Sequence, residues 1–382
     1  MPIDCRLTGA NVLRPEGWSN VPLSILDGML ADERAPREVD LSGYLVLPGI
    51  VDVHGDGFER HMAPRRGALR EAQNGVVAVA AELAANGITT AVLAQFFSWE
   101  GGMRGPEFAE HVFESVVAVN PSVPVDLRLQ LRLETHLMDE FARAEAAIER
   151  FEIRFVVFND HLPHARLAEG RKPPRLTGQA LKSGRSPETH LALMQELHAR
   201  GREVPAALDT FCDRLVARNV VIGSHDDTTS QDRAIWARRG ATVSEFPETV
   251  EAARSAREDG AHIVLGAPNV VRGASHAGNV AAVDLIAAGL CDALASDYHY
   301  PSPMRAAFRL EELGMCDLET AWALVSTGPA QVLGLSDRGV VKAGQRADLV
   351  VLDPRTRRVA ATLAGGEVAY MTGDVAERFC AR

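Results

Sequence analysis

Residues 45–56 read LVLPGIVDVHGD, and this stretch decides the fold. Its apolar, β-prone run ends at His54 and Asp56. Four later runs of the same kind end at or just before a histidine or an acidic residue, namely Glu134, His161, His225 and Asp297. In a (β/α)8 barrel the carboxyl ends of all strands converge on one mouth, so residues far apart in sequence meet there. Convergence of these residues would make a binuclear metal site.

The middle of the chain alternates predicted strands with predicted helices. The strands are residues 45–53, 88–94, 125–133, 153–158, 220–223, 241–246, 263–266 and 293–295. Helical periodicity is clear at residues 75–85, 189–200, 248–259 and 279–288, and each segment ends at a glycine, the usual left-handed cap. Eight strands are the number that a closed barrel requires. Residues 163–187, rich in Arg, Lys, Pro and Gly, are expected to form a long loop at the mouth.

The two ends of the chain are predicted to form a smaller domain together. Both ends contain short extended runs broken by Gly and Pro, and the tail runs are residues 340–341, 347–352, 359–363 and 368–370. Because chain termini often meet and edge strands need partners, we expect one β-sandwich from residues 1–44 and 338–382. The predicted fold class is therefore α/β. A TIM barrel at residues 45–337 would be the metal-dependent catalytic domain, and the β-sandwich would lie beside it.

The composition of the chain indicates which binding partners and which cellular compartment to expect. The chain has 382 residues, of which 46% are hydrophobic, and a formal charge of −11, which argues against non-specific binding to nucleic acid. Its five cysteines contain no CxxC pair, as expected for thiols in a reducing cytoplasm. The sequence shows neither a basic leader before an apolar stretch nor eighteen consecutive apolar residues. We expect a cytoplasmic protein without membrane or nucleic-acid partners.

The histidines and acids at the strand ends suggest divided roles around two divalent ions. Side chains two apart on a strand share a face, so His54 and Asp56 can touch one ion. Glu134 would bridge two ions, and His161 and His225 would complete the coordination shell of the second ion as neutral nitrogen ligands. Asp297 would act as a ligand and as the general base for a metal-bound water. Zinc, manganese and iron all suit imidazole and carboxylate ligands, and zinc is the first choice.

Each candidate ligand also has a simpler interpretation. Glu134 could be a solvated charge at a strand end, where His136 competes for the same face. His161 lies beside Asp160 and His164, as in a polar loop. Residues 224–227, SHDD, could cap the helix that follows them. The metal interpretation is favoured because every candidate falls at the carboxyl end of a strand.

Several stretches resemble a known family. Residues 47–56 (LPGIVDVHGD) are similar to the opening strand of the amidohydrolase superfamily, and residues 344–352 (GQRADLVVL) to its returning β-sandwich. Residues 54–65, 223–229 and 266–279 resemble the diphosphatases of phosphonate utilisation. Residues 159–163 (NDHLP) and 296–301 (SDYHYP) fit the same family, so the resemblance covers nearly the whole chain.

The resemblance implies hydrolysis of α-D-ribose 1-methylphosphonate 5-triphosphate to the 5-phosphate and pyrophosphate. A small phosphorylated substrate needs cationic groups outside the metal shell. We expect Arg272 and His276 to bind it, with Arg60 and Arg166 as further candidates; for most of the arginines nearby, a solvated surface charge is the alternative.

Two features depart from the family patterns. The superfamily usually has His-x-His on the first strand, whereas here Asp56 takes the second place, as in the diphosphatases. Gly55 and Gly57 stand where that family more often has Thr and Asn, which removes two polar side chains beside the metals. The strand count places His161 and His225 on the fourth and fifth strands, whereas the superfamily template has the fifth and sixth. An extra short strand near residues 266–268 would reconcile the two.

Two other functions stay open. One is an amidohydrolase acting on a cyclic amide or N-acyl substrate, in which Arg272 would bind a substrate carboxylate. The other is a non-catalytic metal-binding barrel used for binding or assembly. A homo-oligomer is compatible with all three interpretations.

Overall fold

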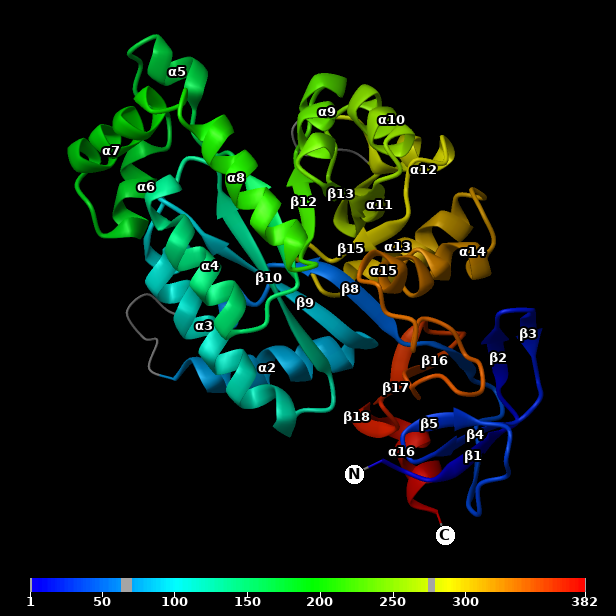
Figure 1. Ribbon diagram of the computed structural model, residues 1–382. Helices are drawn as coiled ribbons and strands as arrows, with labels where there is room; N and C mark the ends of the chain where they lie inside the picture. Colours follow the sequence, from blue (N-terminus) through cyan, green and yellow to red (C-terminus); the bar gives the residue numbers. More distant parts are fainter. Residues whose placement is uncertain (1, 63–70, 274–278, 382) are drawn as a thin grey trace. The chain divides into compact units, whose positions relative to one another are not determined.

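A computed structural model describes residues 2–62, 71–273 and 279–381 (Figure 1). The chain forms two compact units. The first unit contains residues Met1–Leu93, Ala118–Arg128 and Val264–Arg382, and the second contains Ala94–Val117 and Leu129–Ile263.

An eight-stranded sheet carries the candidate site. In chain order its strands are β8 (Ile50–Gly55), β9 (Ile88–Phe97), β10 (Asp126–Glu134), β11 (Phe155–Asn159), β12 (Val221–His225), β13 (Ala241–Glu245), β14 (His262–Gly266) and β15 (Ala293–Ala295). The strands follow one another in the sheet in this same order. Pairs such as β8 with β9 and β11 with β12 are parallel. All eight predicted strands are present.

The first and last strands of this sheet meet within the first unit. Gly55 forms a parallel bridge with Asp297, and the Asp297 amide donates to the His54 carbonyl at 2.9 Å. A parallel eight-stranded sheet whose first and last strands meet is a TIM barrel, so the predicted fold class is confirmed.

The first predicted strand is interrupted at Gly49. Residues before it form β7 (Leu45–Pro48), which pairs with strands of the chain termini, and residues after it form β8. The Gly49 amide donates to the Asp348 carbonyl at 2.8 Å, and a Cβ on Gly49 would lie 2.3 Å from Oγ1 of Thr89. Only glycine therefore fits where the chain leaves one sheet for the other.

The ends of the chain form two further sheets in the first unit. The four-stranded sheet has the order β5 (Met29–Ala31), β4 (Leu23–Leu26), β1 (Cys5–Thr8), β6 (Glu38–Asp40). The six-stranded sheet has the order β18 (Glu367–Met371), β17 (Arg358–Ala364), β16 (Leu349–Asp353), β7, β2 (Asn11–Arg14), β3 (Gly17–Ser19).

The six-stranded sheet joins both ends of the chain. Figure 1 shows the orange and red tail strands beside blue strands of the front part, and β16 pairs with β7. Apolar residues of both terminal sheets share one core, for example Ile25 and Leu349. The predicted tail strand at residues 340–341 is absent. The domain division at residues 44 and 338 stays a prediction.

The helices connect the barrel strands and flank the terminal sheets. They are α1 (Glu59–Met62), α2 (Ala72–Ala85), α3 (Pro106–Val119), α4 (Phe141–Arg150), α5 (His164–Ala168), α6 (Leu176–Ser183), α7 (Pro187–Ala199), α8 (Val204–Ala217), α9 (Ser230–Arg238), α10 (Val250–Glu258), α11 (Ala267–Arg272), α12 (Ala282–Ala287), α13 (Ser302–Glu312), α14 (Leu318–Ala323), α15 (Thr327–Val332) and α16 (Gly373–Cys380). Short 3-10 turns are η1 (Gly102–Arg104), η2 (Asn120–Ser122) and η3 (Met138–Glu140). Within the described ranges, none of the helices has the length and apolar character to cross a membrane.

Two local expectations are wrong. Residues 163–187 are not a long loop but carry α5 and α6, because their scattered apolar residues Leu167 and Leu176 are buried against Trp99 and Met194. The four predicted helices form, but only three of their four glycines have positive φ, and Gly201 does not.

Candidate active site

In the first unit, the backbone holds three of the candidate residues together. His54 is the fully buried penultimate residue of β8, and its carbonyl accepts from the amide of Asp297. The Asp297 carbonyl in turn accepts from the Asp56 amide at 2.9 Å. Asp297 has φ 55°, in the left-handed region. We call the edge where β8 meets the residues after β15 the closing edge of the barrel. Its hydrogen bonds fix the backbone positions from which the side chains of His54, Asp56 and Asp297 extend.

A buried carboxyl group lies beneath this edge. Asp52 accepts hydrogen bonds from both the amide, at 2.9 Å, and the hydroxyl of Ser296. Burial raises the pKa of Asp52 to about 6. Asp52 thus links the first barrel strand to the residue that precedes Asp297.

Gly55 and Gly57 leave no vacant space where the family more often has polar side chains. A Cβ on Gly55 would lie 2.8 Å from Cε1 of Tyr300 and 2.9 Å from Oδ2 of Asp52. A Cβ on Gly57 would lie 3.0 Å from the carbonyl oxygen of Tyr298. Other groups of this chain occupy the space that larger residues would need.

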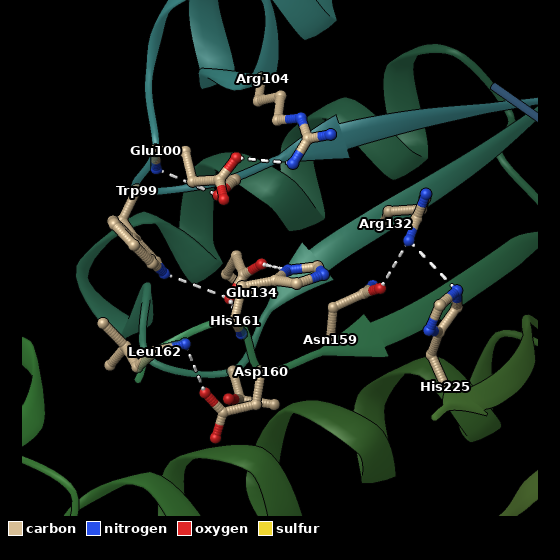
Figure 2. A network of polar contacts seen from close by, with 12 residues as sticks. Trp99, Glu100, Arg104, Arg132, Glu134, Asn159, Asp160, His161, Leu162 and His225 are labelled. Carbon is tan, nitrogen blue, oxygen red and sulfur yellow. Dashed lines mark hydrogen bonds and ion pairs between the residues drawn. The ribbon is translucent and has the colours of Figure 1, made fainter. Parts of the chain in front are cut away.

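In the second unit, Glu134 and His161 form a direct pair (Figure 2). Glu134 ends β10, is fully buried, and accepts from Trp99 Nε1 and from the His161 amide, each at 3.2 Å. Its other oxygen contacts His161 Nδ1. Burial lowers the pKa of His161, but the hydrogen bond to Glu134 and the negative charge of Glu134 together outweigh burial, so the pKa is raised. Glu134 is therefore not a solvated charge at a strand end.

His225 ends β12 and is oriented by two neighbours. Its Nε2 lies 3.1 Å from Nη2 of Arg132, which also donates to Asn159 at 3.0 Å (Figure 2). Its Nδ1 lies 3.0 Å from Oδ2 of Asp226. Arginine can only donate, so Nε2 accepts and Nδ1 carries the proton in this arrangement. Burial lowers the pKa of His225.

The helix after His225 is not capped by residues 224–227. Thr229 accepts from the Asp232 amide, and Asp232 accepts from the Thr229 amide, which makes a capping box at the start of α9. Asp227 instead accepts from the buried hydroxyls of Ser224 and Ser244. The capping alternative for residues 224–227 is wrong.

Glu245 is a candidate that the sequence patterns missed. It ends β13, is fully buried, and stands opposite His225 in the strand register. Its Oε1 accepts from Gln130 Nε2 at 2.8 Å. The sequence contains one sign of it, because Glu245 lies at the downstream end of the apolar run 241–246. Phe246 follows it, so the run does not end at an acidic residue as the other runs do.

The strand count from the sequence is correct, and the proposed repair is wrong. His161 follows the fourth barrel strand and His225 ends the fifth. Residues 266–268 form no extra strand, because Pro268 lies in the first turn of α11, where its missing amide hydrogen costs nothing.

The predicted substrate-binding residues have different surroundings. Arg60 donates to the Tyr298 carbonyl at 3.2 Å and pairs with Glu82. Arg272 ends α11, and its Nε lies 3.5 Å from the Pro268 carbonyl. Arg166 is exposed on α5. His276 lies outside the described residues.

Sequence comparisons identify the relatives of this chain. A model of the amidohydrolase family matches residues 264–370. The alpha-D-ribose 1-methylphosphonate 5-triphosphate diphosphatase of Escherichia coli (strain K12) is 34% identical over 335 residues, covering 84% of this chain and 86% of that protein. The chain belongs to the family of this diphosphatase, within the amidohydrolases.

Solved structures share the fold of this amidohydrolase at low sequence identity. N-acyl-D-glutamate deacylase from Bordetella bronchiseptica, complexed with zinc and a phosphonate inhibitor, is 14% identical, with a TM-score of 0.59 and 97% of each chain covered. A Xaa-Pro dipeptidase is 13% identical, with a TM-score of 0.64, covering 97% of this chain and 100% of the other. At these identities the likeness shows the fold alone.

Proposed function

We propose that this chain hydrolyses α-D-ribose 1-methylphosphonate 5-triphosphate to the 5-phosphate and pyrophosphate in phosphonate catabolism. The observation that carries the proposal is the 34% identity to the Escherichia coli diphosphatase over most of both chains. Asp56 at the second place of the first-strand motif supports this branch over a His-x-His amidohydrolase.

The proposed metal ligands are His54, Asp56, Glu134, His161, His225 and Asp297. Three imidazoles and three carboxylates at strand ends fit divalent zinc, and manganese or iron would take the same donors. When bound, such ions lower the pKa of a coordinated water and draw charge from phosphoryl oxygens. Glu245, buried beside His225, joins these residues as a further candidate.

The protein groups around these ligands have separate proposed tasks. The Asp297 carboxylate takes the proton of the attacking water, from a position held by the backbone bridge to Gly55. Trp99 and the His161 amide hold the Glu134 carboxylate in one orientation. Arg60, Arg166, Arg272 and His276 are proposed to bind the phosphates. Of these, Arg60 contacts the carbonyl of Tyr298, the residue after Asp297.

Pyrophosphate release from a substrate panel tests the proposal. Protein loaded with zinc or manganese is incubated with ribose 5-triphosphates, cyclic amides and N-acyl amino acids. We expect stoichiometric pyrophosphate and 5-phosphate from the methylphosphonate substrate. Turnover of an amide without pyrophosphate release from any triphosphate would refute the proposal and support the amidohydrolase alternative.

Asp297→Asn tests the role of the general base. Asparagine tolerates the left-handed backbone at φ 55° and keeps an oxygen that can ligate a metal, so the fold should be unchanged. We expect kcat to fall by at least about 100-fold. Asp284→Asn, an exposed acid on α12, is the control and should keep wild-type turnover. Wild-type kcat in Asp297→Asn would remove Asp297 from this role.

A further inference from the structure

Three histidines and an aspartate that are not among the proposed ligands gather in the second unit. His136 follows β10, Asp160 follows β11, His164 begins α5, and His198 lies in the last turn of α7. We call these residues the imidazole cluster.

The ligand atoms of His136, Asp160 and His164 lie close enough to share one ion. One atom from each residue lies within 4.8 Å of the other two. His164 Nε2 lies 3.0 Å from Asp160 Oδ2, and His136 Nδ1 lies 3.6 Å from Asp160 Oδ1. Tetrahedral zinc with bonds of about 2.0–2.2 Å separates its ligand atoms by about 3.3–3.6 Å. Asp160 Oδ1 lies 3.1 Å from His164 Nε2 and 3.6 Å from His136 Nδ1, both near this separation, and the ligand atoms of His136 and His164 lie within 4.8 Å of each other. A modest movement of the two imidazoles would bring all three ligand atoms to one ion.

The neighbours of these three residues prepare them for a cation. His198 Nδ1 lies 2.8 Å from His164 Nδ1, so one of the two nitrogens carries the hydrogen. When His164 Nδ1 donates, its Nε2 presents a lone pair toward Asp160, as metal-bound histidines do when their other nitrogen is hydrogen-bonded. The Leu162 amide donates to Asp160 Oδ1 at 3.2 Å and holds the carboxylate in place (Figure 2).

Burial and charge favour a divalent transition ion. The His136 side chain is 6% exposed, whereas those of Asp160 and His164 are 40% and 37% exposed. An ion can therefore enter from solvent while its inner ligand stays fixed. Two imidazoles and one carboxylate suit zinc and its neighbours, whereas calcium and magnesium prefer oxygen ligands.

We infer that the imidazole cluster is a second metal site that binds Zn²⁺ through His136, Asp160 and His164, with His198 orienting His164. The bound ion would cross-link the segments that follow β10 and β11 to the first turn of α5, and through His198 to α7. In Figure 1, α5, α6 and α7 lie together, and this ion would anchor them to the strand ends. The site goes beyond the proposed function and does not depend on the reaction.

Anomalous diffraction from zinc-soaked wild-type crystals gives the most direct test, since it needs no variant. We expect an anomalous peak at bonding distance from His136, Asp160 and His164. Crystals with zinc at other sites and no peak among these three residues would overturn the inference. In that case the cluster is an ion pair, with a protonated His164 between Asp160 and His198.

Metal counting on variants gives an independent test. His164→Asn and His136→Asn should each bind one zinc equivalent fewer than wild type after dialysis against the same zinc solution. His111→Asn, at an exposed histidine on α3, is the matched control and should keep the wild-type count. His198→Asn should keep the count and weaken the affinity by roughly 10–100-fold, because it removes only the orienting partner.

Both variants and the control share the proposed catalytic ligands, so their difference reports on the imidazole cluster alone. The rise in unfolding temperature that zinc causes, measured for each protein against its own metal-free form, should be larger in wild type and His111→Asn than in His164→Asn. An equal zinc count in all proteins would overturn the inference. Absence of pyrophosphate release would refute only the proposed function.

Discussion

At the scale of single residues, the candidate site is shaped as much by what lacks a side chain as by what has one. Gly55 lies between His54 and Asp56. Tyr300, Asp52 and the Ser296 hydroxyl occupy the space that a Cβ on Gly55 would need. All three neighbours are buried, so none can move into solvent to make space. The identity of this residue follows from packing against Asp52 on the same strand and against Ser296 and Tyr300, which follow β15.

Gly55→Ala should therefore destabilise the protein. The new methyl group would meet Tyr300 Cε1 at 2.8 Å, and overpacking of this kind costs about 1–3 kcal/mol. Urea unfolding followed by circular dichroism measures the loss. The control is Gly178→Ala on α6, where a Cβ meets nothing within 4 Å and the change should stabilise the helix by up to about 1 kcal/mol. Equal stability of the two variants would contradict this account of Gly55.

The sequence predicted which polar residues end strands, but not what they contact. His54, Glu134 and His225 follow the pattern of an apolar run closed by a polar residue, which any reader of the chain can see. The contact of Trp99 with Glu134, by contrast, joins positions 35 residues apart, and no local pattern encodes it. Cross-strand partners depend on register, which is set by the whole sheet.

At the scale of elements, the residue at which α9 begins is fixed by the polar side chains of its N-cap and first turn. The segment after His225 contains several acids and hydroxyls, and both Thr228 with Gln231 and Thr229 with Asp232 have the spacing of a capping box, but the structure forms it with Thr229 and Asp232. The helix therefore begins at Ser230, and Asp227 is left for buried serine hydroxyls.

Thr229→Ala should cost about 0.5–2 kcal/mol of stability, because the Asp232 amide loses its acceptor at the start of α9. Thermal unfolding is the measurement. Thr210→Ala is a suitable control, since this exposed hydroxyl only donates back to the Ala206 carbonyl inside α8. A loss no larger than that of the control would mean that the capping box does not stabilise α9.

Elements with weak periodicity were the hardest to predict. The region of α5 and α6 has the composition of a loop, yet a few leucines there are buried with Trp99 and Met194. Tertiary burial of so few residues is invisible to a pattern that counts polar and glycine content, and it outweighs local preference.

At the scale of the whole molecule, one buried arginine ties the tail to the barrel strands of the first unit. Arg338 donates to Thr90 on β9 at 2.8 Å and to Asp126 on β10 at 2.7 Å. It also lies 3.9 Å from the buried carboxylate of Asp348. Its charge is therefore shared by segments from distant parts of the sequence.

Arg338→Met should destabilise the protein by about 1.5–3 kcal/mol, because it removes the charged donor of Asp126 and Thr90, although Arg128 still pairs with Asp126 and Arg346 with Asp348. The comparison is Arg355→Met, which removes an arginine that is 84% exposed and should change stability by less than about 1 kcal/mol. Chemical denaturation of both variants gives the two values. A similarly small loss of stability in both variants would show that the contacts of Arg338 with Thr90 and Asp126 do not stabilise the fold.

The closing edge of the barrel also determines when the proposed site can come into being. Asp52 and Ser296 are 244 positions apart, and the Gly55 bridge to Asp297 spans nearly the same distance. Contacts between such distant positions form slowly, because the entropy cost of closing a long loop comes before the contacts can stabilise the chain. During synthesis, His54 leaves the ribosome long before its partner strand exists. This edge can therefore assemble only after β15 has been made, and a product truncated before Ala293 would lack Asp297 while keeping the other proposed ligands.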